Sequence, residues 1–243
     1  RAPLVERGNK WGEYAGVVDN LHFAECNATV SMGKWLKSYA DDCGSKVETV
    51  AIQFPDPHFK KRHHKRRVVQ PALVRALAEG LTPGARVFLQ SDVKDVSEDM
   101  RDKFERFGAH LFDIDASLHD VSAVDPKVLK SNAESAVANA AAAFQEDEKA
   151  RLRREKAEKE GYPGRRKDAE KAEGEEKAEE KVKEAPKAEE EGEGWRSAWA
   201  AAGDREGWLD ENPLGVPTER EVQTNSTNGR CYRVMLVRNS TPV

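Results

Sequence analysis

The stretch from Val47 to Arg67 places a carboxylate on a rigid turn next to a dense group of cations. The carboxylate is Asp56, which stands between Pro55 and Pro57. Proline cannot continue a strand ladder, and the second proline keeps Asp56 out of the helical region, so the turn is stiff. A carboxylate can accept the N–H groups of one polar ligand while neighbouring cations hold a polyanion. The cations follow directly as Lys60, Lys61, Arg62, Lys65 and Arg66.

Both features also have ordinary explanations. Asp56 could cap the turn or pair with its basic neighbours, and the cations could form a solvated face or a nuclear-localisation signal. Three histidines, His58, His63 and His64, lie among the cations, but no carboxylate or cysteine completes a metal site at usable spacing. We therefore expect no metal ion here.

Three other places carry polar residues that could serve a ligand. Asn27 and Ala28 end the segment 20–28, and Asp92 ends the segment 86–92; both segments are expected to be strands. Open α/β sheets bind ligands at the carboxyl ends of their strands, although Asn is equally suited to a plain strand-end turn. Thr218 precedes Glu221 by three residues, which is also the spacing of a helix capping box.

The elements that position these residues alternate along the chain. Apolar runs predict strands over residues 20–28, 47–54, 86–92 and 232–237, with a short one within 110–115. Helical spacing of apolar residues predicts helices over 3–14, from Ser31 onward, over 68–80 and over 96–107. This alternation favours an α/β fold with a parallel, doubly wound sheet.

Residues 145–194 differ from the rest of the chain. They hold 18 acidic and 14 basic side chains, which accounts for the whole formal charge of −4. Glu, Lys and Ala dominate, so this insert is expected to be disordered or a solvated helix. Trp195, Trp199 and Trp208 then mark the return of packing, and the first two are spaced to share one helical face.

Cysteine usage and hydropathy restrict the class of protein. The three cysteines are widely spaced, which predicts reduced thiols in an intracellular protein, with cytoplasm, nucleus and plastid not distinguished. No apolar run approaches the roughly 20 residues that a membrane span needs. The first residue is Arg1, so we expect that the natural N-terminus lies upstream.

Two motifs resemble one enzyme family. The first is Phe54-Pro55-Asp56-Pro57-His58-Phe59-Lys60-Lys61 followed by His64-Lys65-Arg66-Arg67, and the second is Gly215-Val216-Pro217-Thr218-Glu219-Arg220-Glu221 with Tyr232-Arg233. Together they are similar to the signature of the tRNA (guanine-N7)-methyltransferases. The resemblance covers roughly residues 1–115 and 207–239. It implies a Rossmann-like class I methyltransferase sheet, N-terminally truncated, with its core in 1–144 and 195–243 around the insert 145–194.

The resemblance also implies an activity and roles for the candidate residues. The activity is methyl transfer from S-adenosylmethionine to N7 of a guanine in tRNA, without a metal. The resemblance implies that Asn27 and Ala28 contact the adenine of the cofactor. Asp56 is expected to bind the guanine base, whose N1–H and exocyclic amine a carboxylate can accept, and Asp92 could face the substrate from its comparable edge position. Thr218 and Glu221 are implied to meet the substrate and the methionine end of the cofactor. The tRNA phosphates are expected to be bound by Lys60, Lys61, Arg62, Lys65 and Arg66. Whether the enzyme also needs a helper subunit is not decided by the sequence.

One part of the family pattern is missing from this sequence. A first strand with a glycine-rich turn and a second strand with an acidic end are expected upstream of Arg1, and no G-x-G-x-x-G follows any strand here. The chain is then either a fragment or a degenerate copy, and a non-catalytic RNA-binding module is the alternative function. A DNA or protein methyltransferase on the same fold would leave the first motif and its basic run unexplained.

Overall fold

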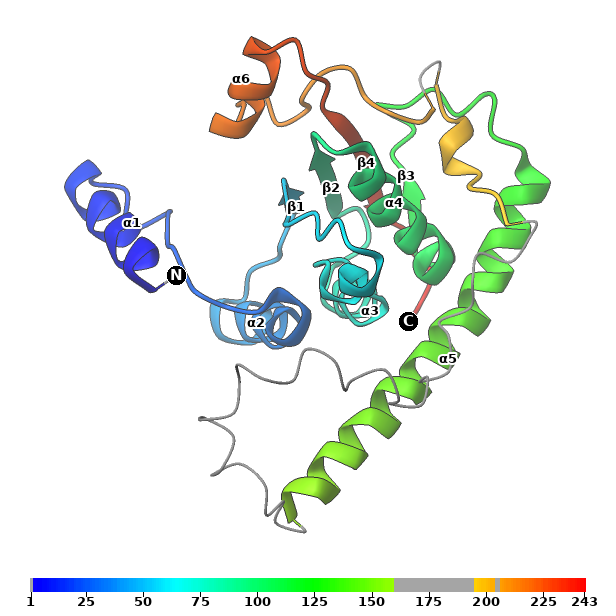
Figure 1. The fold of residues 1–243 in the computed structure, drawn as a ribbon, viewed down its shortest axis with the longest axis horizontal. Helices are drawn as coiled ribbons and strands as arrows, with labels where there is room; N and C mark the ends of the chain where they lie inside the picture. Colours follow the sequence, from blue (N-terminus) through cyan, green and yellow to red (C-terminus); the bar gives the residue numbers. More distant parts are fainter. Residues whose placement is uncertain (1, 160–194, 204–205) are drawn as a thin grey trace, which may run out of the picture.

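The computed structural model describes residues 2–159, 195–203 and 206–243, which form a four-stranded sheet and its covering helices (Figure 1). The strands lie in the order β1-β2-β4-β3. Their bounds are Thr49–Gln53 for β1, Arg86–Ser91 for β2, Phe112–Ile114 for β3 and Tyr232–Arg238 for β4. The predicted α/β class is confirmed.

The sheet is mixed, so the expectation of a purely parallel sheet is wrong. β1 and β2 are parallel, whereas β4 lies antiparallel between β2 and β3. Tyr232 at the start of β4 pairs with Ser91 at the end of β2. The chain therefore enters β4 from the edge at which β2 ends, and it must run back in the opposite direction.

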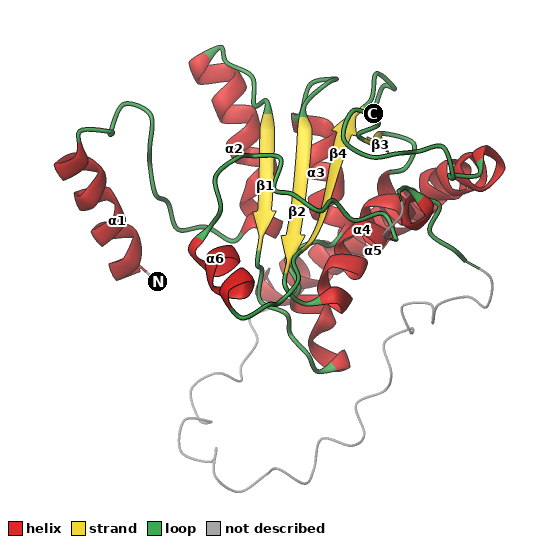
Figure 2. Ribbon diagram, turned by 90° about the horizontal axis from the view of Figure 1, so that it is seen from above, coloured by secondary structure: helices red, strands yellow, loops and turns green. Residues whose placement is uncertain are grey.

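The helices and short 3₁₀ turns lie mostly between the strands in sequence. The packed core joins α3, α4 and the sheet through side chains such as Leu73, Leu77, Val87, Phe104 and Leu236. Figure 2 shows α2, α3 and α4 on the same side of the sheet. Helices on both faces, as a doubly wound sheet requires, are not seen in the described part of the chain. The bounds are Ala2–Ala15 (α1), Ala28–Cys43 (α2), Lys61–Arg66 (η1), Pro71–Gly80 (α3), Lys94–Gly108 (α4), Pro126–Lys159 (α5), Trp199–Ala201 (η2) and Glu219–Ser226 (α6).

The N-terminal segment departs from the sequence prediction. Residues 20–27 form no strand, and α2 begins at Ala28 and not after Ser31. The reason is local, because the Asn27 side chain accepts a hydrogen bond from the Thr29 amide at 3.2 Å and caps the helix. α1 lies apart from the sheet (Figure 1), and its Trp11 is 55% exposed.

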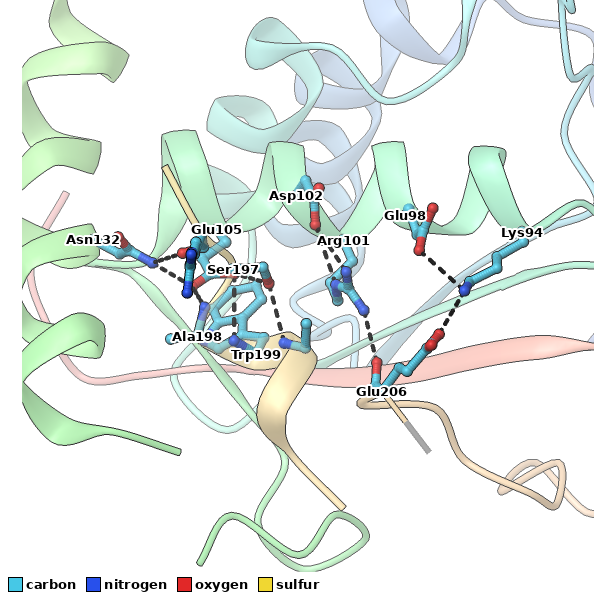
Figure 3. A network of polar contacts seen from close by, with 12 residues as sticks. Lys94, Glu98, Arg101, Asp102, Glu105, Asn132, Ser197, Ala198, Trp199 and Glu206 are labelled. Carbon is cyan, nitrogen blue, oxygen red and sulfur yellow. Dashed lines mark hydrogen bonds and ion pairs between the residues drawn. The ribbon is translucent and has the colours of Figure 1, made fainter. Parts of the chain in front are cut away.

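A polar anchor on α4, drawn in Figure 3, fastens the segment that begins at residue 195 to the core. Glu105 is fully buried and accepts hydrogen bonds from Asn132 Nδ2 and from the Ala198 amide, both at 2.7 Å. Ser197 Oγ donates to the same carboxylate. The anchor thus fixes α5 and the segment after the insert to one residue of α4.

The predictions for the tryptophans in residues 195–208 are confirmed in part. Trp199 and Trp208 are buried, which confirms the return of packing. Residues 195–198 are not helical, so the helical face predicted for Trp195 and Trp199 is wrong; Trp195 lies instead against the Arg106 guanidinium at 4.2 Å. Of the insert, residues 145–159 continue α5, and residues 160–194 lie outside the described residues. Among the helices of the described ranges, none has the length and apolarity needed to cross a membrane.

Candidate functional site

The turn that carries Asp56 begins where β1 ends at Gln53 and is fastened to the neighbouring strand. The Phe54 amide donates to the Gln90 carbonyl of β2 at 2.8 Å. Phe54 and His58 both have positive φ, 48° and 43°, which side-chain-bearing residues rarely adopt. Such conformations cost on the order of 1 kcal/mol each and persist where the surroundings enforce them. The turn is therefore held in one strained shape.

The Asp56 carboxylate has one engaged and one free oxygen. Oδ1 accepts a hydrogen bond from the His58 amide at 3.2 Å, and the His58 ring nitrogen Nδ1 lies 3.7 Å away. Oδ2 makes no hydrogen bond with any described residue, and the side chain is 62% exposed. The capping role that the sequence left open is thus real, but it leaves an acceptor facing outward.

Arg67 enforces the turn from the inside. Its side chain is 3% exposed, and its Nε donates to the Pro57 carbonyl at 3.0 Å. The guanidinium also pairs with Asp95 and, at 3.5 Å, with Asp99, both on α4. Sequence reasoning left this residue in a run of basic residues without a role of its own. Only the fold shows that it is a structural clamp.

The remaining cations form the exposed turn η1 and its flank. Their positive field is visible in the pKa of His63, which is lowered by partial burial and by the charges of Arg66, Arg62 and Lys60. None of the five predicted phosphate ligands forms an ion pair with a described residue. An exposed group of unpaired like charges repels itself and is suited to a polyanion. These five exposed residues are Lys60, Lys61, Arg62, Lys65 and Arg66.

Asp92 follows the end of β2, and its carboxylate is bound by Arg220 of α6. Arg220 donates to Asp92 Oδ2 through Nε at 3.0 Å and through Nη2 at 2.6 Å. Because β1 and β2 are adjacent and parallel, Asp92 and the Asp56 turn lie at the same edge of the sheet. Figure 2 shows α6 at this edge, beside the ends of both strands.

Thr218 and Glu221 build the start of α6. Thr218 is the N-cap, and its hydroxyl accepts from the Glu221 amide at 3.2 Å, as a capping box predicts. The Glu221 carboxylate is 3% exposed and binds Arg233 of β4 at 2.7 Å and Asn212 at 2.8 Å. Burial raises the pKa of Glu221, but the hydrogen bonds from Asn212 and Arg233 outweigh it and lower that pKa overall. Glu221 therefore fixes α6 on the sheet.

Asn27 and Ala28 do not follow a strand; they begin α2. The helix start is tied to the basic turn, since Thr29 Oγ1 donates to the Val68 carbonyl at 3.4 Å. This contact brings Asn27 to the residues that follow η1. Its Oδ1 is used in the cap, and its Nδ2 makes no hydrogen bond with a described residue, so it can donate to a ligand.

Two residues of this edge were missed by the sequence reasoning, Arg67 and Arg220. The only signal for Arg220 was its place between Thr218 and Glu221, because its partner Asp92 lies 128 residues earlier in the chain. Within the described ranges, no cluster of three or more His, Cys, Asp or Glu side chains could hold a metal ion.

Comparison with known proteins identifies the family. A family model described as "Putative methyltransferase" matches residues 4–146, more than half of the chain. A tRNA (guanine-N(7)-)-methyltransferase of Synechococcus sp. strain JA-3-3Ab is 54% identical over 104 residues, which are 43% of this chain and 41% of that protein.

Other relatives carry the same name. The protein of Synechocystis sp. is 47% identical over 104 residues, 43% of this chain and 47% of its own length. The protein of Thermosynechococcus vestitus is 49% identical over 109 residues, which are 45% of this chain and 48% of that protein. The chain thus spans less than half of the length of these curated relatives. They confirm the resemblance inferred from the two motifs, and with the family match they show that the chain belongs to this methyltransferase family.

Proposed function

We propose that the protein containing this chain transfers a methyl group from S-adenosylmethionine to N7 of a guanine in tRNA. The observation that carries the proposal is the juxtaposition at one sheet edge of a locked carboxylate, Asp56, and five unpaired, exposed cations. The names of the relatives support the same activity and substrate.

Asp56 is proposed to orient the base. Guanine presents N1–H and an exocyclic amine, two donors that a carboxylate accepts, and Asp56 Oδ2 has no other partner among the described residues. N7 of neutral guanine already has a free lone pair, so no strong base is needed to activate it. What the reaction needs is in-line placement of N7 against the methyl group, which is an effect of orientation.

The described residues fit part of the cofactor. S-adenosylmethionine supplies an electrophilic methyl group on a sulfonium. The free amide of Asn27 fits an acceptor such as an adenine ring nitrogen, with Ala28 beside it. Thr218 and Glu221 use their polar groups within the protein, so we propose that they shape the methionine end of the site by holding α6.

The basic turn is proposed to bind the tRNA backbone, and Asp92 to border the substrate together with its partner Arg220. We also propose that residues 1–144 and 195–243 form one methyltransferase core and that 145–194 is an insert within it. This division is supported by β4 and Trp199, which lie after the insert and pack in the same core as α3 and α4.

The test of the function is methyl transfer by the full-length protein with Asp56→Asn. Asparagine keeps the shape of the side chain but replaces one acceptor oxygen with an N–H donor. This removes a charged hydrogen bond worth about 2–4 kcal/mol, or roughly 30- to 1000-fold in turnover. The affinity for tRNA should change little, because phosphate contacts supply it.

The matched control is Asp120→Asn. Asp120 is also an exposed turn aspartate whose Oδ1 accepts from a backbone amide two residues on, Ser122, at 2.9 Å. It should keep wild-type turnover. Wild-type turnover in Asp56→Asn would refute the orienting role, and loss of thermal stability in that variant alone would show that Asp56 serves only the turn.

A further inference from the structure

A hollow opens at the same sheet edge, away from the basic turn. It has a volume of about 270 Å³ and lies between the end of β2 and the outer half of α6. The walls are polar and include two guanidinium groups, Arg220 and Arg230. Asp92, Gln223 and Thr224 complete most of the lining.

A tight turn after α6 brings Arg230 to this wall. Asn228 has a positive φ of 55°, and the Gly229 amide donates to the Thr224 carbonyl at 2.8 Å. A Cβ at Gly229 would lie 2.8 Å from Thr224 Cγ2, so only glycine allows the turn to approach α6 this closely. The residue after the turn therefore lies beside the C-terminal half of the helix.

Arg230 lies over an aromatic ring and forms no ion pair with a residue in the described ranges. Its Cζ lies 5.2 Å from the centre of the Tyr232 ring, and Tyr232 meets Trp208 edge-on at 5.6 Å. Trp208 is covered on its own face by Arg101 at 4.6 Å. Arg230 makes no hydrogen bond with any residue in the described ranges, so its N–H donors are oriented but unused. A guanidinium that lies over an aromatic ring keeps its edge free for a carboxylate or a phosphate.

The other charges of the hollow cancel. Arg220 binds Asp92 through two nitrogens and donates to Gln223 Oε1 at 3.3 Å. The Asp92 carboxylate is therefore neutralised. A second carboxylate, Glu206, is paired with Lys94 at 2.6 Å, and this pair, together with the nearby charge of Arg230, lowers the pKa of Glu206. Because Glu206 is already paired, the charge of Arg230 remains. A free guanidinium fork binds an oxyanion through two parallel N–H···O bonds, and a phosphate is such an anion.

We propose that this hollow binds a backbone phosphate of the RNA next to the methylated guanine; the inference rests on the proposed function. η1 follows β1 through the Asp56 turn, whereas the hollow lies at the end of β2, so the basic turn and Arg230 offer two separate phosphate sites at the edge that carries Asp56. Holding the RNA strand at two points stops it from pivoting, which places the base as well as binding it.

The test is a salt titration of tRNA binding by the full-length protein with Arg230→Gln. Losing one phosphate contact should lower the slope of log affinity against log salt by about 0.7–0.9. Arg230→Lys keeps the charge and should restore the slope. The matched control is Arg75→Gln on α3, another stacked arginine, whose Cζ lies 3.8 Å from the Phe144 ring centre; it should leave the slope unchanged.

Each remaining outcome overturns the proposal. An unchanged slope in Arg230→Gln, with normal tRNA binding by the wild type, removes the phosphate site and leaves the proposed function intact. A raised KM for S-adenosylmethionine with an unchanged slope would assign the hollow to the cofactor's carboxylate. A wild type that does not bind tRNA would refute the proposed function together with this site. Thermal melting of the variant, expected to be unchanged because Arg230 is exposed, separates these outcomes from misfolding.

Discussion

Arg66 and Arg67 are neighbours of the same type, but the first is exposed and the second is buried with three backbone and carboxylate partners. The difference matters for the reaction because the buried one holds the carbonyl of Pro57, next to Asp56. Guanidinium is planar and donates in several directions at once, so it can serve a carbonyl and two carboxylates together.

We expect Arg67→Lys to loosen the Asp56 turn. A lysine ammonium is a single point charge that cannot reach Pro57, Asp95 and Asp99 at once, so about 1–3 kcal/mol of hydrogen bonding is lost. Turnover at saturating tRNA and cofactor should fall about tenfold, while the salt slope of binding stays unchanged because the charge is kept. Arg75→Lys is the matched control, and wild-type turnover in Arg67→Lys would contradict the clamping role.

His119 should make the stability of the fold depend on pH. It is 6% exposed, and its Nε2 accepts a hydrogen bond from the Met235 amide at 3.1 Å, which requires a neutral ring. Burial lowers the pKa of His119 from 6.5 to about 4, against the opposing charge of Asp115. The folded state therefore binds fewer protons than the unfolded one. Its stabilising contribution is complete above pH 6.5 and is lost as the pH falls toward 4.

This loss amounts to about 3 kcal/mol between neutral pH and pH 4. His119→Gln keeps an acceptor for the Met235 amide but does not titrate, so its unfolding free energy should fall less steeply over the same range. Urea unfolding of both proteins at several pH values measures the difference. Parallel curves would show that His119 does not stay neutral in the folded protein.

At the scale of elements, the single residue Glu105 joins several segments of the fold. The carboxylate accepts hydrogen bonds from α5 and from residues 197–198, and no cation of the described residues forms an ion pair with it (Figure 3). We expect Glu105→Gln to lower the unfolding free energy by about 1–3 kcal/mol, since one acceptor becomes a donor facing donors in a buried site. Glu98→Gln on the same helix removes an exposed charge and should cost less than about 1 kcal/mol. Equal effects in urea unfolding would contradict the anchoring role.

The sequence predicted elements whose pattern is local and missed arrangements that depend on distant partners. β1, β2 and β4 were expected because continuous apolar runs bounded by turns signal buried strands. The strand expected over residues 20–28 failed because Asn27 caps a helix, and local capping outweighed a weak apolar pattern. The direction of β4 depends on the side from which the chain returns, which no local pattern encodes.

The candidate site divides in the same way. The rigid turn at Asp56 and the cap at Thr218 follow from spacing alone, and both are present. The pairs Asp92–Arg220 and Glu221–Arg233 join segments that only the fold brings together, so the sequence could not show that these two carboxylates are already occupied.

For the whole molecule, the carboxyl edge of the sheet should account for the salt dependence of tRNA binding. The described ion pairs lie on other elements, such as α3 and α4, whereas no cation of η1 forms an ion pair with a described residue. Replacing Lys60, Lys61 and Arg62 with Ala should weaken binding and reduce the salt slope by about 2. A titration with the wild-type slope would leave these residues as a solvated face.

The insert should be dispensable for the fold of the whole molecule. Its composition supplies few apolar residues for a core, and the side chains described over residues 145–153 lie on the surface of α5. The contacts that close the core lie outside residues 145–194, because Asn132 on α5 donates both to Glu105 and, at 3.0 Å, to the Arg196 carbonyl. Removing residues 145–194 leaves this anchor intact.

A linker that replaces residues 145–194 must still span the length of helix α5 between Asn132 and Phe144. From Asn132 to Phe144 an α-helix rises about 18 Å, so a linker returning to Trp195 beside Asn132 needs more than about 6 extended residues. We expect a protein in which about 12 Gly/Ser residues replace 145–194 to melt near the wild-type temperature and to bind tRNA with the same salt slope. Thermal melting and the titration check this. A variant that unfolds despite a sufficient linker would show that residues 145–194 contribute to the core.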